Sequence, residues 1–192
     1  MSLLRSLDER LLRIARTRWH SREAERAVIA FSKIGEHGAV WLALGAAGQG
    51  LDRRRRARWR RAVRAVALAY ALNTGLKLLA GRRRPELAGL PALTGTPTAL
   101  AFPSAHAATS FAGAHAYARL GLPRAALYGL ALALSGSRVY LGVHHPSDLL
   151  GGALLGTAVA QLAGPAPALS ATQAPSATQP PPNVRHAMSH AR

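Results

Sequence analysis

The feature that most constrains the fold of this chain is the way its apolar residues are grouped. They form blocks at about residues 65–76, 125–137 and 149–163, and positive charges stand at the ends of the blocks. Each block is shorter than the ~20 residues that a membrane-spanning helix needs, but amphipathic flanks and arginines that reach toward water extend it. The grouping therefore predicts a small helical membrane protein with several spans rather than a soluble domain.

We predict an all-α fold, an integral membrane helical bundle of about five spans. The expected spans cover about residues 38–51, 62–79, 103–120, 123–141 and 146–163. In the first of them, Trp41 has the position of an anchor at the membrane interface. Because charged groups are costly at hydrocarbon depth, we expect the polar stretch before this span to lie outside the membrane core.

The two ends of the chain differ from the blocks between them. Residues 3–19 place leucines on one side of a helix and arginines on the other, which is typical of an interfacial amphipathic helix; a surface helix of a soluble domain is the alternative. We assign residues 1–36 to this interfacial region, 37–164 to the spanning domain and 165–192 to a tail. Ala, Pro, Gln, Ser and Thr dominate the tail, which cannot bury enough apolar surface to fold.

The chain is strongly basic, with 25 Lys and Arg against 8 Asp and Glu and a formal net charge of +17. Eight arginines are concentrated in residues 53–64. They could bind nucleic acid, with Trp59 as a stacking platform, or mark the cytoplasmic side of a membrane protein and touch anionic headgroups. We favour the second interpretation, and predict no nucleic-acid partner, because apolar blocks border the run on both sides.

Alternation of the spans gives a topology. If residues 53–64 are cytoplasmic, the loops at 77–101 and 138–148 lie outside, at the same face as the start of the third span. Charged residues near a span are by default functional, so we predict a site at this extracytoplasmic face of the cell membrane. The polar side chains collected there are Lys77, Arg84, Ser104, His106, Arg138, His144 and Asp148.

These residue types suit phosphoryl transfer. Guanidinium and ammonium groups bind phosphate oxygens, and a helix that begins after Pro103 would point free amides at the same anion. One histidine can attack phosphorus while another protonates the leaving oxygen, and a carboxylate four residues after His144 would fix the tautomer of that ring. We find no carboxylate cluster suited to a metal ion, and predict neither a metal nor another cofactor.

The same residues form three groups that resemble the signature of the type 2 phosphatidic acid phosphatase (lipid phosphate phosphatase) superfamily. The groups are Lys77-x6-Arg84-Pro85, Pro103-Ser104-Ala105-His106 and Ser137-Arg138-x5-His144-x3-Asp148. The resemblance implies that His144 forms a phosphohistidine, that His106 is the general acid and that Asp148 orients His144. The phosphate ligands that it implies are Lys77, Arg84, Ser104, Arg138 and the amide of Ala105.

The sequence departs from the family pattern at Ala105, where the family usually has glycine. A methyl group there narrows the approach of the backbone to phosphate but leaves the amide in place. Outside the motifs, we expect Arg82 and Arg83 in solvent or at lipid headgroups, with substrate contact as the alternative. We expect His115 as a buried polar contact and His145 as a helix cap or as a residue that supports the site from behind.

The motifs bind phosphate and do not distinguish one lipid from another. Among family members, this short, basic, alanine-rich chain is most similar to bacterial enzymes that act on lipid-linked polyprenyl phosphates. A polyprenyl diphosphate, a phosphatidylglycerophosphate or a phosphatidate is the alternative substrate. A membrane protein that binds anionic lipid without catalysis is the alternative of another class, and the oligomeric state stays open.

Overall fold

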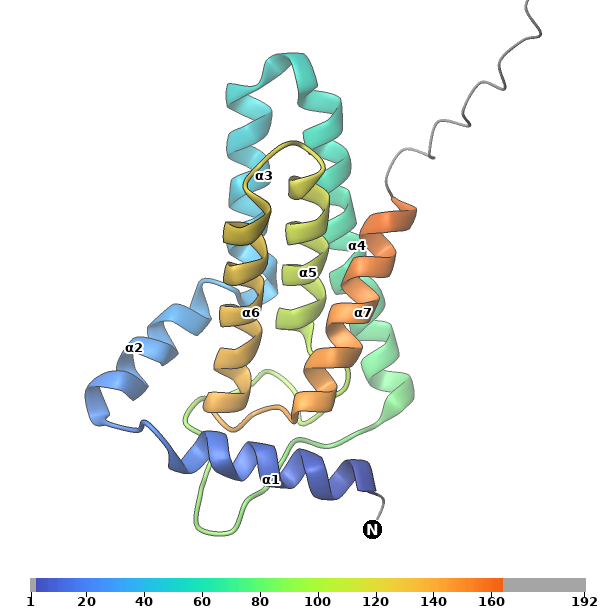
Figure 1. Cartoon of the computed structure of the whole chain (residues 1–192). Coiled ribbons are helices and arrows are strands. Elements are labelled where there is room, and N and C mark those ends of the chain that lie inside the picture. The colour runs from blue at the N-terminus through green and yellow to red at the C-terminus, as the bar shows by residue number, and fades with distance from the viewer. Residues whose placement is uncertain (1–2, 164–192) are drawn as a thin grey trace, which may run out of the picture.

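The computed structural model describes residues 3–163, which form helices and no strand. The helices are α1 (Leu3–Thr17), α2 (Arg22–Lys33), η1 (Glu36–Gly38), α3 (Ala39–Leu51), η2 (Arg53–Arg55), α4 (Arg56–Ala80), α5 (Ala105–Ala118), α6 (Arg124–Tyr140) and α7 (Pro146–Leu162), as drawn in Figure 1. The predicted all-α class is confirmed. The prediction for the tail at 165–192 lies outside the described residues.

The five predicted spans coincide with α3 to α7, and the main difference is that α4 begins six residues before the expected start. By length and composition, one continuous stretch, Arg53–Ala80, is suited to cross a membrane. A second candidate joins Arg22–Lys33 to Glu36–Leu51 across a bend of 41°. Because α5, α6 and α7 have only 14 to 17 residues, the number of spans stays a prediction.

Helix α5 is the centre of the bundle and packs against α4, α6 and α7 (Figure 1). Two glycines let α7 approach it closely. A Cβ atom at Gly156 would lie 2.0 Å from the carbonyl oxygen of Ala108, and one at Gly152 would lie 2.4 Å from that of Ser104. This small-residue packing holds the first turns of α5 and α7 side by side, and there the amide of Ser104 donates to the carbonyl of Asp148 at 2.9 Å.

Trp41 lies in the core, and the prediction of an interfacial anchor is wrong. Its side chain is fully buried, and its indole Nε1 donates to Ser110 Oγ at 3.0 Å. The physical reason is Gly113 of α5, where a Cβ atom would lie 2.5 Å from the indole ring. The missing side chain leaves the space that the indole fills, and Tyr117 donates to the Trp41 carbonyl at 2.7 Å.

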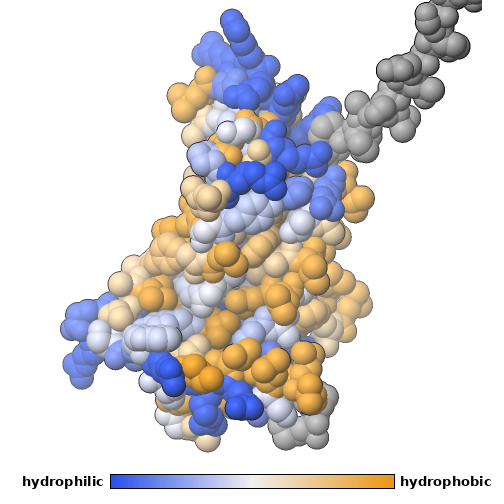
Figure 2. Space-filling view, viewed as in Figure 1, coloured by the Kyte–Doolittle hydropathy of each residue, from blue (hydrophilic) through white to orange (hydrophobic). Residues whose placement is uncertain are grey.

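The surface of the molecule has an apolar belt between two hydrophilic ends (Figure 2). Leucines on α4, α6 and α7 that are 41–84% exposed are Leu68, Leu72, Leu76, Leu78, Leu79, Leu132, Leu150 and Leu154. Exposed apolar surface of this extent marks contact with a membrane or a partner, and a belt around a bundle is the arrangement that a bilayer would cover.

Helix α1 lies across the end of the bundle where α5 and α7 begin (Figure 1). Asp8, Leu12 and Arg16 are its buried residues. Its large apolar side chains face away from the bundle and are 43–89% exposed; they are Leu3, Leu4, Leu7, Leu11 and Ile14. Two polar side chains of α1 are therefore buried against the bundle, while its leucine face is exposed.

Candidate active site

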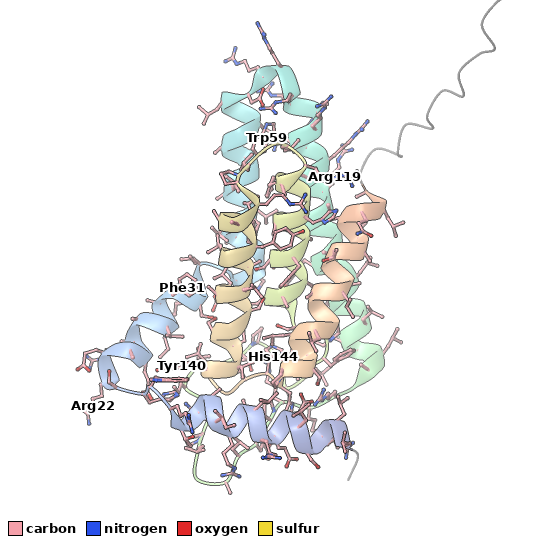
Figure 3. All side chains as sticks on the ribbon, in the orientation of Figure 1. Arg22, Phe31, Trp59, Arg119, Tyr140 and His144 are labelled. Carbon is pink, nitrogen blue, oxygen red and sulfur yellow. The ribbon has the colours of Figure 1, made fainter. Side chains whose placement is uncertain are left out.

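The three sequence motifs meet at the end of the bundle that α1 covers. His144 lies there in the turn between α6 and α7 (Figure 3). Arg84 is partly buried, and the other six predicted side chains are less than 10% exposed: Lys77, Ser104, His106, Arg138, His144 and Asp148. The structure thus brings residues from four segments of the chain into one buried polar cluster.

The turn that carries His144 follows from its local sequence. Gly142 has a φ of +76°, which glycine adopts without strain, and this residue turns the chain out of α6. Pro146 then starts α7, and the side chain of Asp148 accepts from the amide of His145 at 2.8 Å. The expectation that His145 caps a helix is confirmed, because a capping box joins His145 and Asp148.

The two ring nitrogens of His144 have different partners. Nδ1 lies 3.4 Å from Oδ2 of Asp148, and Nη1 of Arg84 lies 3.1 Å from Nε2. A carboxylate and a guanidinium fix the tautomer, because Asp148 can only accept at Nδ1–H and Arg84 can only donate to the lone pair of Nε2. The lone pair that could attack phosphorus therefore points at a guanidinium group, which is the predicted cation for phosphate.

Arg84 is held rigidly at this position. Its Nε donates to the carbonyl of Thr98 at 2.8 Å, and its Nη1 donates to the carbonyl of Val143 at 2.7 Å. Among the residues that the structure describes, Nη2 has no hydrogen-bond partner and is left for an anion.

Lys77 has a different environment from the one we expected of a phosphate ligand. Its ammonium group donates to the carbonyl oxygens of Leu100, Ala101 and Pro103 at 3.3, 3.1 and 3.0 Å. It therefore shapes the loop before α5. Its contact with phosphate stays a prediction, which requires that one of these carbonyls be exchanged for a phosphate oxygen.

The first turn of α5 offers donors to an anion. The first hydrogen bond inside the helix runs from the amide of Ala108 to the carbonyl of Ser104 at 3.0 Å, so the amides of residues 105–107 are not used by the helix itself. Ser104 Oγ is buried without a hydrogen-bond partner in the described part of the chain. The methyl group of Ala105 does not remove its amide, and free amides beside an unsatisfied hydroxyl favour a bound anion.

His106 and Arg138 are joined by Ser32, a residue that sequence reasoning missed. His106 Nε2 donates to the carbonyl of Ser32 at 3.0 Å, and Nη1 of Arg138 donates to Ser32 Oγ at 2.8 Å. Ser137 also donates to this hydroxyl, at 3.1 Å. Ser32 is 1% exposed, so the last turn of α2, which we had assigned to an interfacial region, forms one wall of the cluster.

Arg82 is only partly exposed and its guanidinium is paired with carboxylates of the protein, so the prediction of a solvated side chain is wrong. Its Nη1 lies 3.0 Å from Oδ1 of Asp148, and its Nη2 donates to Asp8 at 2.8 Å. Asp8 also accepts from the amide of Ser147 at 3.0 Å and from its hydroxyl. The chain of contacts Asp8–Arg82–Asp148–His144 therefore connects α1 to the candidate nucleophile.

Two further observations concern His115 and the arrangement of possible metal ligands. His115 makes the expected polar contact, since its Nδ1 lies 3.2 Å from the hydroxyl of Tyr128, but the side chain is only partly buried. Within residues 3–163, no group of three or more His, Asp or Glu side chains is arranged to hold a metal ion.

Comparison with known proteins identifies the family. A profile of the PAP2 superfamily matches residues 59–167, more than half of the 192 residues. The decaprenylphosphoryl-5-phosphoribose phosphatase of Mycolicibacterium smegmatis is 40% identical over 124 residues, which cover 64% of this chain and 68% of that protein. The chain belongs to the PAP2 superfamily. The decaprenylphosphoryl-5-phosphoribose phosphatase of Mycobacterium tuberculosis strain H37Rv is 39% identical to this PAP2 protein over 129 residues, covering 67% and 72%.

Solved PAP2 structures have the same fold. LpxE of Aquifex aeolicus superposes with a TM-score of 0.71 at 25% identity, covering 82% of this chain and 94% of that one. A transmembrane PAP2 type phosphatidylglycerolphosphate phosphatase of Bacillus subtilis gives 0.69 at 22% identity, covering 85% of each chain. The chain is therefore a PAP2 phosphatase with the helical fold of membrane phosphatases.

The protonation state of His144 in this PAP2 phosphatase is set by its surroundings. Burial lowers the pKa of His144 to about 3; the hydrogen bond with Asp148 acts against this shift, and the charge of Arg84 adds to it. Because a histidine is protonated only below its pKa, we expect a neutral ring between about pH 5 and pH 8. NMR of ¹³C-labelled histidine in the substrate-free protein would show no titration of the signal that His144→Asn removes, and a midpoint inside this window would contradict the expectation.

Asp8 is expected to act as a positioning residue for the PAP2 site. Although burial by itself would raise the pKa of Asp8, hydrogen bonds from Ser147 and Arg82 hold it below its ordinary value, so the group is ionised at neutral pH. Asp8→Asn replaces a charge-assisted hydrogen bond, worth about 1.5 kcal/mol, with a weaker one to a neutral amide. The guanidinium of Arg82 is then held mainly by Ser147 and Asp148. We expect kcat to fall roughly tenfold with KM nearly unchanged, measured as phosphate release.

The control is Glu9→Gln, the neighbouring residue of α1, whose side chain is exposed. This variant removes the same charge and should keep the wild-type kcat. Equal kcat values for Asp8→Asn and Glu9→Gln, or a rise in KM alone, would show that Asp8 does not position the site.

Proposed function

We propose that this protein is an integral membrane phosphatase that hydrolyses the phosphomonoester of a polyprenyl-linked lipid through a phosphohistidine on His144. The observation that supports this most is the pair of contacts on one imidazole, with Asp148 at Nδ1 and Arg84 at Nε2. It combines the nucleophile, the group that orients it and a cation for the incoming phosphate in one buried place.

The proposed reaction has two steps. In the first, Nε2 of His144 attacks phosphorus, the bond from phosphorus to the ester oxygen breaks, and His106 gives a proton to the leaving oxygen. In the second, His106 takes a proton from water as that water attacks the phosphohistidine, which releases inorganic phosphate and restores His144. Arg84, Arg138, Ser104 and the amides at the start of α5 bind the phosphate oxygens in both steps.

Ser32 has a specific part in this proposal. Its carbonyl can only accept a hydrogen bond, so Nε2 of His106 carries a proton in both forms of the ring. The proton that moves to and from the substrate is therefore the one on Nδ1. The hydroxyl of Ser32 meanwhile holds the guanidinium of Arg138, and the same residue thus orients the acid and one phosphate ligand.

We propose that the protein crosses the cell membrane several times, with the site at the extracytoplasmic edge. The apolar belt in Figure 2 supports membrane insertion. Trp59 lies at the end of the bundle away from His144 (Figure 3), and the segment around it, residues 53–64, carries eight arginines, which favours a cytoplasmic position for that end. A site at the rim of the bundle lets a polyprenyl chain stay in lipid while its phosphorylated headgroup enters the cluster.

The substrate that we favour is a decaprenylphosphoryl-5-phosphoribose, because the two relatives at about 40% identity are named for it. The test is phosphate release by the purified protein from a panel of a prenylphosphoryl-5-phosphoribose, a prenyl diphosphate, a phosphatidylglycerophosphate and a phosphatidate. We expect kcat/KM to be highest for the first. A higher kcat/KM for another lipid of the panel would identify that lipid as the preferred substrate. Absence of phosphate release from all four would overturn the proposed function.

A further inference from the structure

A cavity lies at the end of the bundle opposite the candidate active site. It has a volume of about 390 Å³ and is formed between α4, α5 and α7. Three arginines line it, Arg58 and Arg61 from α4 and Arg119 from the end of α5, above a floor of small apolar side chains such as Ala116 and Ala160. It therefore has a cationic rim and an apolar base.

The positive charge of this cavity is not compensated within the described part of the chain. No acidic residue lines the cavity, and Arg58, Arg61 and Arg119 form no ion pair there. Asp52 is the acidic residue of this arginine-rich segment, and it is occupied by Arg55 at 2.6 Å and by the indole of Trp59 at 3.1 Å. Three neighbouring cations without a counter-charge attract an anion.

The cavity cannot be an extension of the phosphatase site. His106 and Arg119 are thirteen residues apart along α5, which is about 20 Å at 1.5 Å per residue. Figure 3 places Arg119 and Trp59 at one end of the bundle and His144 at the other. A ligand in the cavity is therefore independent of the substrate.

The position of the cavity indicates the kind of anion. The arginine-rich end of the molecule borders the apolar belt (Figure 2), and the cavity has the same polarity, with guanidinium groups beside alanine and leucine side chains. Arginine forks bind phosphate oxygens, and basic clusters beside a membrane attract anionic lipids. A free anion would neutralise the arginines of the rim but would leave the alanine side chains of the floor uncovered. An amphiphile has a charged group for the arginines and an apolar chain for the alanines.

We propose that this cavity binds an anionic phospholipid, with the headgroup phosphate between Arg58, Arg61 and Arg119 and the first part of the acyl chains against the alanines. This lipid is not a substrate, because its phosphate lies at the far end of the bundle. It would fix the ends of α4, α5 and α7 to one another at the membrane surface.

The test compares two triple variants of the full-length protein with the same change in charge. R58Q/R61Q/R119Q removes the cavity arginines, and R53Q/R54Q/R60Q removes three exposed arginines of the same segment that do not line the cavity. Binding of fluorescent phosphatidylglycerol and phosphatidylcholine is measured for each in detergent micelles. We expect the cavity variant to bind phosphatidylglycerol at least tenfold more weakly, the other variant to match the wild type, and phosphatidylcholine to bind to none of them.

Further arms separate the remaining explanations. R58K/R61K/R119K keeps the charge and should retain binding, and phosphate release by R58Q/R61Q/R119Q, expected within about twofold of the wild type, shows that this variant is folded. An equal loss of binding in both glutamine variants would show diffuse attraction and overturn the proposal. Displacement of the lipid by an equal concentration of inorganic phosphate would identify a free-phosphate site and would also overturn it.

Discussion

Replacing His144 with asparagine is expected to lower phosphate release by about 10⁴-fold to 10⁶-fold, the range seen when a nucleophile is removed from an otherwise intact site. Asparagine keeps an N–H donor near the position of Nδ1 but is smaller than the ring and has no nucleophilic nitrogen at the position of Nε2. The loss should be equally large for a prenyl phosphate and for p-nitrophenyl phosphate, because both need the same attack. Initial rates with the two substrates measure it.

A covalent readout distinguishes a nucleophile from a binding residue. Acid-labile, alkali-stable phosphate should appear on the wild-type protein during turnover of labelled substrate, and the His144→Asn variant should carry none. His115→Asn is the matched control, since His115 contacts Tyr128 in the bundle and should keep nearly full activity. More than about one hundredth of the wild-type rate in His144→Asn would exclude His144 as the nucleophile.

The helices and the convergence of the motifs could be predicted because both depend on local patterns. Pro103 and Pro146 mark helix starts, and apolar blocks mark the helices that follow. Since consecutive helices of a bundle run in opposite directions, the loops at 81–104 and 141–145 had to meet at one end. The structure places them there, with Ser104 donating to the carbonyl of Asp148.

The supporting contacts could not be predicted, because they join positions far apart in sequence without any periodic signal. Ser32 is 74 positions from His106, and Asp8 is 139 positions from Ser147. Both belong to amphipathic helices whose composition indicated a surface location, and the pattern does not show that the polar side of α1 faces the protein.

The sequence also could not show which arginine of a consecutive run takes which role. Arg82, Arg83 and Arg84 are consecutive, yet Arg82 binds two carboxylates and Arg84 contacts the candidate nucleophile. Trp41 was misassigned for a similar reason, since its burial depends on the absence of a side chain at Gly113 on another helix. Charge and hydropathy indicate whether a side chain prefers water or an apolar environment. Which residue it contacts depends on how the helices pack.

His106→Asn is expected to give different losses with different leaving groups. An alkyl or sugar oxygen leaves poorly without a proton, so phosphorylation of His144 by a prenylphosphoryl-5-phosphoribose should slow by about 10²-fold to 10⁴-fold, as for the loss of a general acid. p-Nitrophenolate leaves without protonation, so phosphorylation by p-nitrophenyl phosphate should stay within about tenfold of the wild type. Rapid-quench measurement of the first turnover gives both rates.

In the second step of the proposed reaction, hydrolysis of the phosphohistidine, His106 should act as a general base. Because the variant lacks the group that takes a proton from water, p-nitrophenolate should appear as a burst of one equivalent per protein, followed by a slow steady rate while phosphohistidine accumulates. Ser32→Ala is the control: it keeps the carbonyl that binds His106 and removes the hydroxyl that holds Arg138, so substrate binding should weaken without a burst. Equal losses for both substrates, with no phosphoenzyme, would show that His106 orients the site and transfers no proton.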